Sequence, residues 1–145
     1  MAVAGWLGVA ACAAPEAKGL RVSLGREDAG ADAYGMRQYV LAYLKTGSVR
    51  SENAAALQQA HLANIERMAE AGQLVLAGPF LDGGEVRGIY IFDTPSIDTA
   101  RDWTATDPAV QAGVFDMELH PWYGSAALLA VNELHHQLAE ASITD

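Results

Sequence analysis

The residue with the clearest capacity for chemistry is His61, which opens the stretch HLANIERMAEAGQLVLAGPF, residues 61–80. On the helical period of about 3.6 residues, it shares one face with Leu57, Ile65 and Met68. The opposite face is mostly polar and carries Asn64, Glu66, Arg67 and Glu70. A histidine on an apolar face is either a core residue satisfied by a backbone carbonyl or an imidazole whose protonation is set by a neighbour. By periodicity alone the core reading is favoured.

The elements that must position His61 follow from propensity and turn signals. Ser51 and Glu52 begin a helix that carries His61 and ends at Gly72, the usual left-handed stop. Thr94 followed by Pro95 predicts the cap and first position of a second helix, which runs to about residue 104. Four strands are predicted at residues 38–45, 73–77, 86–92 and 114–120, and a final amphipathic helix at residues 126–141.

This order of elements predicts an α+β fold, a ferredoxin-like βαββαβ arrangement with two helices on one face of an antiparallel sheet and an added C-terminal helix. Gly78 and Pro79 are expected to end pairing of the second strand, because proline lacks the amide that a central ladder needs. The helix-free face would expose Tyr39, Leu41 and Tyr43, so we expect a homodimer that covers it.

Composition limits the classes of function. The chain has 145 residues and a formal net charge of -9, with no cluster of Lys and Arg. A single domain with a real core is expected, and nucleic acid or an anionic membrane surface is a poor partner for it.

The N-terminal segment offers one further feature. Residues 9–12 read VAAC and end at Cys12, the one cysteine of the chain, which resembles a bacterial lipoprotein cleavage site. No positive charge precedes the short apolar run, so a disordered tail is the equal alternative. If Cys12 is lipidated, the protein lies in the periplasm or cell envelope and contacts the membrane through that lipid anchor. We expect this location slightly more than the cytoplasm. The domain limits are residues 1–35 for the signal-like segment and flexible arm, 36–125 for the folded domain and 126–145 for a C-terminal helical extension.

Three stretches together resemble the YCII-related (YciI-like) family: residues 61–80, GIYIFDTPSIDTARDWTATDP and AGVFDMELHPW. The resemblance spans roughly residues 39–122. It implies a dimeric α/β barrel and an active site formed by a histidine on the first helix and an aspartate in the DP element, which are His61 and Asp107 here. The alternative for Asp107 is a purely structural role, as the carboxylate of a turn or helix cap before Pro108.

A carboxylate that accepts from one imidazole nitrogen fixes the tautomer, leaves the other nitrogen free as base or acid, and favours the cationic ring. Such a pair requires neither metal nor cofactor. It suits proton transfer on a compact ring-shaped or carbonyl-bearing ligand: isomerisation, elimination such as dehydrochlorination, or lactone chemistry. Further pocket candidates are Tyr90, His120, Trp122 and Tyr123.

The alternative function is a non-catalytic dimer that binds a small ligand or an envelope protein, with His61 and Asp107 joined in a structural hydrogen bond. An enzyme should show His61 beside a pocket that solvent reaches, with one ring nitrogen free.

Overall fold

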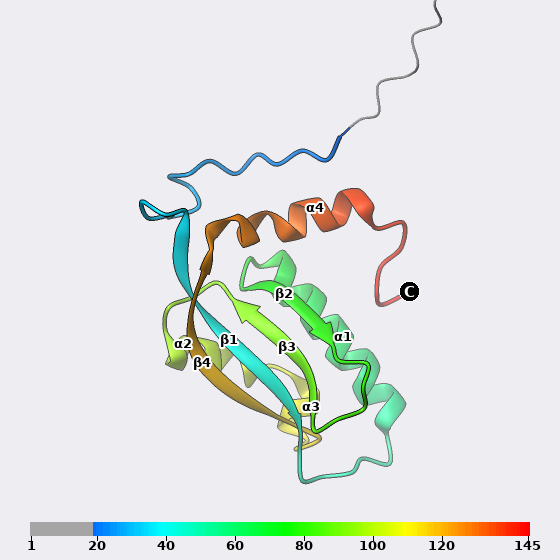
Figure 1. The fold of residues 1–145 in the computed structure, drawn as a ribbon. Helices are drawn as coiled ribbons and strands as arrows, with labels where there is room; N and C mark the ends of the chain where they lie inside the picture. The colour runs from blue at the N-terminus through cyan, green and yellow to red at the C-terminus, as the bar shows by residue number, and fades with distance from the viewer. Residues whose placement is uncertain (1–18) are drawn as a thin grey trace, which may run out of the picture.

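The computed structural model describes residues 19–145, so Cys12 and its predicted lipidation lie outside the described residues. Its centre is a four-stranded sheet in the order β2-β3-β1-β4, in which every neighbouring pair is antiparallel (Figure 1). The strands are β1 (Met36–Thr46), β2 (Leu74–Pro79), β3 (Val86–Phe92) and β4 (Phe115–Ser125).

Three helices cover one face of this sheet: α1 (Ala54–Glu70), α2 (Ile97–Thr104) and the short α3 (Pro108–Gln111) (Figure 1). Between them and the sheet lies the main core, built on Val40, Phe92 and Met68, each fully buried. Met117 and Leu119 of β4 pack against it from the predicted apolar face of that strand. The ferredoxin-like βαββαβ prediction is therefore confirmed.

Both predicted helix starts are wrong by two to three residues. The Ser51 hydroxyl accepts from the Asn53 amide, so it forms a turn ahead of α1, whose first helical residue is Ala54. In the same way Thr94 accepts from the amide of Ser96, and it is Ser96 that caps α2 by accepting from Thr99. Hydroxyl side chains form such local turns as readily as caps, and sequence spacing does not separate the two.

The predicted end of α1 is correct. Gly72 has a φ of +69°, and the Gln73 amide bonds back to the Met68 carbonyl at 2.9 Å. This is the bond of a glycine-terminated helix, and it turns the chain directly into β2.

Strand pairing continues further than expected at both edges of the sheet. Pro79 still pairs with Gly88, although pairing was expected to end at residues 78–79, and β4 runs through Pro121 to Ser125 instead of ending at residue 120. The reason is the strand order: β2 and β4 are the outer strands, and an outer strand tolerates a proline whose missing N–H would point away from the sheet.

The C-terminal segment consists of a 3-10 helix, η1 (Ala126–Ala130), and α4 (Val131–Leu138). The predicted helix to residue 141 therefore ends at 138, where Ala139 becomes extended. Leu128 and Leu129 of η1 pack against a cluster of Tyr39, Val75 and Ile91 on the sheet face opposite α1–α3. The face that the sequence leaves uncovered is thus partly covered by the chain itself, while Tyr43 further along β1 stays 36% exposed.

Within residues 19–145, no helix combines the length and the apolarity that crossing a membrane would require.

Candidate active site

His61 and Asp107 meet in the interior, on the helix-covered side of the sheet. His61 lies in the middle of α1, and Asp107 is the residue that caps α3. The two carboxylate oxygens have separate partners: Oδ1 accepts from the Ala109 amide at 2.8 Å, and Oδ2 contacts His61 Nδ1 at 2.6 Å. Asp107 is therefore both the cap carboxylate that a DP sequence suggests and the partner of the histidine.

Both side chains of the His61–Asp107 contact are buried. His61 is 5% exposed and Asp107 is 0% exposed. An ionised carboxylate only accepts hydrogen bonds, so the His61 Nδ1–H donates and Nε2 carries the lone pair of the neutral ring. A short hydrogen bond to a buried carboxylate is of the strong, charge-assisted kind. The tautomer of His61 is thereby set.

The second ring nitrogen of His61 faces Tyr90, which comes from β3. The Tyr90 hydroxyl lies 3.5 Å from Nε2, at the outer limit of a hydrogen bond. Burial raises the pKa of Tyr90 far above its usual value, and the negative charge of Asp107 adds to the effect. Tyr90 therefore remains a neutral O–H donor beside the His61 lone pair.

Because Tyr90 stays protonated in the folded protein but ionises near pH 10 when unfolded, the folded state holds an extra proton above that pH. The free energy of unfolding should fall as pH rises past 10, with Tyr90 contributing about 1.4 kcal/mol of loss by pH 11. Chemical denaturation at pH 9 and pH 11 measures it. Tyr90→Phe should remove that part of the pH dependence; equal slopes in both proteins would contradict the prediction.

Phe115 completes the surroundings of the histidine and was not a candidate from the sequence. Its ring centroid is 5.2 Å from that of His61. Phe115 opens β4 opposite Thr46 and is partly exposed, whereas His61 and Tyr90 are buried. It therefore lies between the pair and solvent. The sequence signal that could have identified Phe115 is its place on the apolar face of the predicted strand.

Asn64 departs from the helical-wheel prediction, which placed it on the polar face of α1. It is 7% exposed, and its Oδ1 accepts from Arg67 at 2.9 Å and from Thr106 at 3.3 Å. Arg67 also donates to Thr106 at 2.9 Å. Since Thr106 directly precedes Asp107, this network ties the aspartate's backbone to the helix that carries His61. The spacing of three residues from His61 was compatible with this face.

The other sequence candidates are not brought to the pair. His120 and Trp122 point from β4 to the opposite sheet face, where His120 bonds to Glu118 at 2.8 Å and Trp122 packs on Tyr39. The Tyr123 hydroxyl bonds to Asp32 near the N-terminal end of the described chain. Of the four pocket candidates, only Tyr90 contacts His61.

Access to the pair is more restricted than we expect for an enzyme. One ring nitrogen is without a short partner, but neither the cavity beside α4 nor the open one at Gly30, Asp32 and Tyr123 is lined by His61 or Asp107. Within residues 19–145, no group of three or more His, Cys, Asp or Glu is arranged to hold a metal ion.

With this geometry established, comparison with known proteins identifies the family. The model of the YCII-related domain matches residues 36–123. The chain belongs to the YCII-related domain family. The matched residues contain β1 to β3 and all but the last two residues of β4, and with them His61, Tyr90 and Asp107, while η1 and α4 lie beyond the matched part of this YCII-related protein.

Among solved structures, this YCII-related chain is similar to 5-chloro-2-hydroxyhydroquinone dehydrochlorinase (TftG) from Burkholderia phenoliruptrix AC1100, in complex with 2,5-dihydroxybenzoquinone. The two are 23% identical, the match covers 58% of this chain and 92% of that chain, and the TM-score is 0.47. No curated protein matches the chain.

Proposed function

We propose that this YCII-related protein is a small-molecule acid–base enzyme in which His61 transfers a proton and Asp107 orients it. The observation that carries the proposal is the buried 2.6 Å contact between His61 Nδ1 and Asp107 Oδ2, which leaves Nε2 with its lone pair. A histidine held in one tautomer by a carboxylate is the usual arrangement of a general base.

The proton transfer follows from these positions. Nε2 of neutral His61 accepts a proton from an acidic C–H of the substrate, and the ring becomes a cation hydrogen-bonded to Asp107. Asp107 accepts the hydrogen bond of that cation and stabilises it. The Tyr90 hydroxyl, which stays protonated, can donate to the oxygen on which the substrate's charge develops. Return of the proton to another carbon gives isomerisation, and loss of a leaving group gives elimination.

A substrate reaches Nε2 only if the side chains around it move. Tyr90 is 3.5 Å from Nε2, and the ring of Phe115 lies on the partly exposed side. We infer that rotation of the partly exposed Phe115 ring, at the first residue of β4, opens the pair. The ligand that fits among these rings is compact and largely apolar.

The near-complete burial of His61 favours one second candidate function. In it the pair is a structural hydrogen bond between α1 and α3, and the domain binds a small ligand or a protein partner without catalysis. Buried polar groups in any stable core are paired in this way. The two functions differ in whether Nε2 ever meets a small molecule.

The discriminating experiment follows deuterium uptake at the α-carbon of simple ring ketones in D₂O by NMR. If the protein is an enzyme, we expect deuterium uptake to be roughly 10²-fold faster with wild type than with His61→Gln. This factor is at the lower end of the range for general-base catalysis. Asp107→Asn should also slow it, with a change in the ¹⁵N shifts of His61 that reports the tautomer. Equal uptake with wild type and His61→Gln would support the binding module instead, and Asp102→Asn, exposed on α2 and away from the pair, serves as the control.

We also propose that the protein is a homodimer formed on the sheet face opposite α1–α3. Tyr43 and His120 form an exposed edge-to-face pair on the part of that face that η1 leaves open. Light scattering should give twice the chain mass, and Tyr43→Glu should shift it to the monomer. A monomeric wild type at micromolar concentration would refute this.

A further inference from the structure

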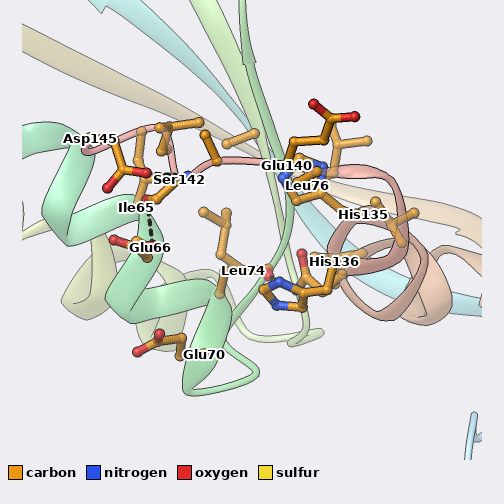
Figure 2. Close-up of a pocket in the computed structure, with 18 residues that line it drawn as sticks. Ile65, Glu66, Glu70, Leu74, Leu76, His135, His136, Glu140, Ser142 and Asp145 are labelled. Atoms are coloured by element: carbon orange, nitrogen blue, oxygen red, sulfur yellow. Dashed lines mark hydrogen bonds between the residues drawn. The ribbon is translucent and has the colours of Figure 1, made fainter.

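The C-terminal segment encloses a cavity of about 580 Å³ between itself, the outer side of α1 and β2 (Figure 2). After α4 the chain returns along β2 to α1, so that segments 65–77 and 131–145 form opposite walls (Figure 1). Neither His61 nor Asp107 lines this cavity. Its volume lies within the range of about 300–1,000 Å³ that is typical of small-molecule sites.

The wall made by the C-terminal segment is fastened at both ends. At the β2 end, Asn132 donates to the Leu74 carbonyl at 2.9 Å. At the α1 end, the hydroxyls of Ser142 and Thr144 donate to the Glu66 carboxylate at 2.8 and 3.1 Å. Because the wall is held by these bonds, the space is maintained by the fold and does not depend on a loose tail.

Part of the cavity lining is apolar. Leu74 and Val75 of β2, each less than 5% exposed, lie behind it, and the partly exposed side chains of Ile65, Leu76 and Val131 supply its apolar surface. Figure 2 shows Leu74 pointing into the space from one side and His136 facing it from α4. An apolar group of a ligand would remove this surface from water, which is favourable by roughly 25 cal/mol per Å² of apolar area.

The charges around the cavity have one sign. Four carboxylates belong to its lining, those of Glu66, Glu70, Glu140 and Asp145, and none of the described residues that line it is Lys or Arg. Glu66 is occupied by the hydroxyls of the tail, whereas Glu70 and Glu140 lie exposed on opposite sides of the space (Figure 2). Carboxylates this close to a site act on a charged ligand within the screening distance of about 8–10 Å in physiological salt.

We propose that this cavity binds an amphipathic organic cation, an ammonium group attached to an apolar chain or ring. The apolar part lies on Ile65, Leu76 and Val131, and the ammonium group lies toward Glu70 and Glu140. Charge complementarity decides against fatty acids and phosphate esters, because no lining Lys or Arg pairs with their anionic groups. One wall of the site lies beyond residue 125, so the site requires this chain's C-terminal extension in addition to the YCII-related domain.

The test uses octylammonium as probe and octanoate as its matched anion, with the full chain and ¹H–¹⁵N spectra. Octylammonium should cause saturable shifts at the amides of residues 74–77 and 131–136, with a dissociation constant at least tenfold lower than that of octanoate. Equal affinity for the two probes, shifts elsewhere, or no saturation would each overturn the proposal.

Two pairs of variants locate the effect. Ala69→Phe, on the α1 wall, should fill the space and weaken octylammonium binding at least tenfold, whereas Ala56→Phe at an exposed position of the same helix should not. The exposed double variant Glu70→Gln/Glu140→Gln leaves the interior intact and should reduce the preference for octylammonium over octanoate to less than threefold. Asp102→Asn, an exposed control outside the cavity, should leave that preference unchanged; any other pattern would refute the assignment.

Discussion

Replacing Asp107 with alanine is expected to lower the free energy of unfolding by about 3 kcal/mol or more. The reason is that one residue satisfies two groups: Oδ1 caps α3 at the Ala109 amide, and Oδ2 accepts from His61. Loss of a helix cap costs about 1 kcal/mol, and loss of a buried hydrogen bond to a charged group about 1.5–3 kcal/mol. Urea denaturation followed by circular dichroism measures the sum.

Asp107→Asn separates the two contributions. An asparagine oxygen still caps α3, but the side-chain NH₂ donates where the carboxylate accepted, so the charge-assisted bond from His61 is lost and this variant should lose roughly 2 kcal/mol while keeping the cap. Asp116→Ala, exposed on β4, is the matched control and should stay within about 0.5 kcal/mol of wild type. If Asp107→Ala were as mild as the control, the pair described here would not exist in solution.

Gly47→Ala is expected to have the next largest effect, about 2–3 kcal/mol of lost stability. A Cβ at this position would stand 2.2 Å from the Gly113 carbonyl oxygen and 2.8 Å from the Val114 carbonyl carbon. Both are backbone atoms, so the chain after β1 must shift. The Gly47 amide bonds to the Val114 carbonyl at 2.8 Å, and this bond would be strained as well.

The shift should also reach the candidate active site, because Val114 is followed by Phe115, whose ring contacts His61. The ¹⁵N signals of His61 should therefore move in Gly47→Ala. The control is Gly78→Ala in the outer strand β2, where an added Cβ meets nothing within 4 Å and φ is not positive. That variant should be neutral or slightly stabilising, and a similar loss in both proteins would show that the close approach at Gly47 is not responsible.

Local sequence signals predicted the elements well but not every boundary. Alternation and the Gly72 stop located the strands and the end of α1, because these depend on neighbours in sequence. The helix α3 was missed, since four residues contain no period. The caps at Ser51 and Thr94 were misassigned because an oxygen that accepts one local amide forms a turn or a cap with the same residue types.

The candidate site was only partly accessible to such reasoning. Periodicity indicated that His61 faces the interior. Its partner, Asp107, lies 46 residues away in the sequence, and only the resemblance to the family pointed to it. Trp122 and His120 were grouped with Tyr90 as pocket candidates, but they lie on the other face of the sheet. For His120, alternation with Met117 and Leu119 already indicated that face, whereas Trp122 lies beyond the predicted end of the strand at residue 120.

The two outer strands each carry a proline, Pro79 in β2 and Pro121 in β4. Each removes one amide from an edge that would otherwise offer a continuous row of donors, and the Asn132 side chain takes up the Leu74 carbonyl on β2. Open sheet edges are the usual starting points of intermolecular β-aggregation. This protein should therefore resist intermolecular extension of its β-sheet. We expect this small acidic domain to stay free of β-aggregates at high concentration.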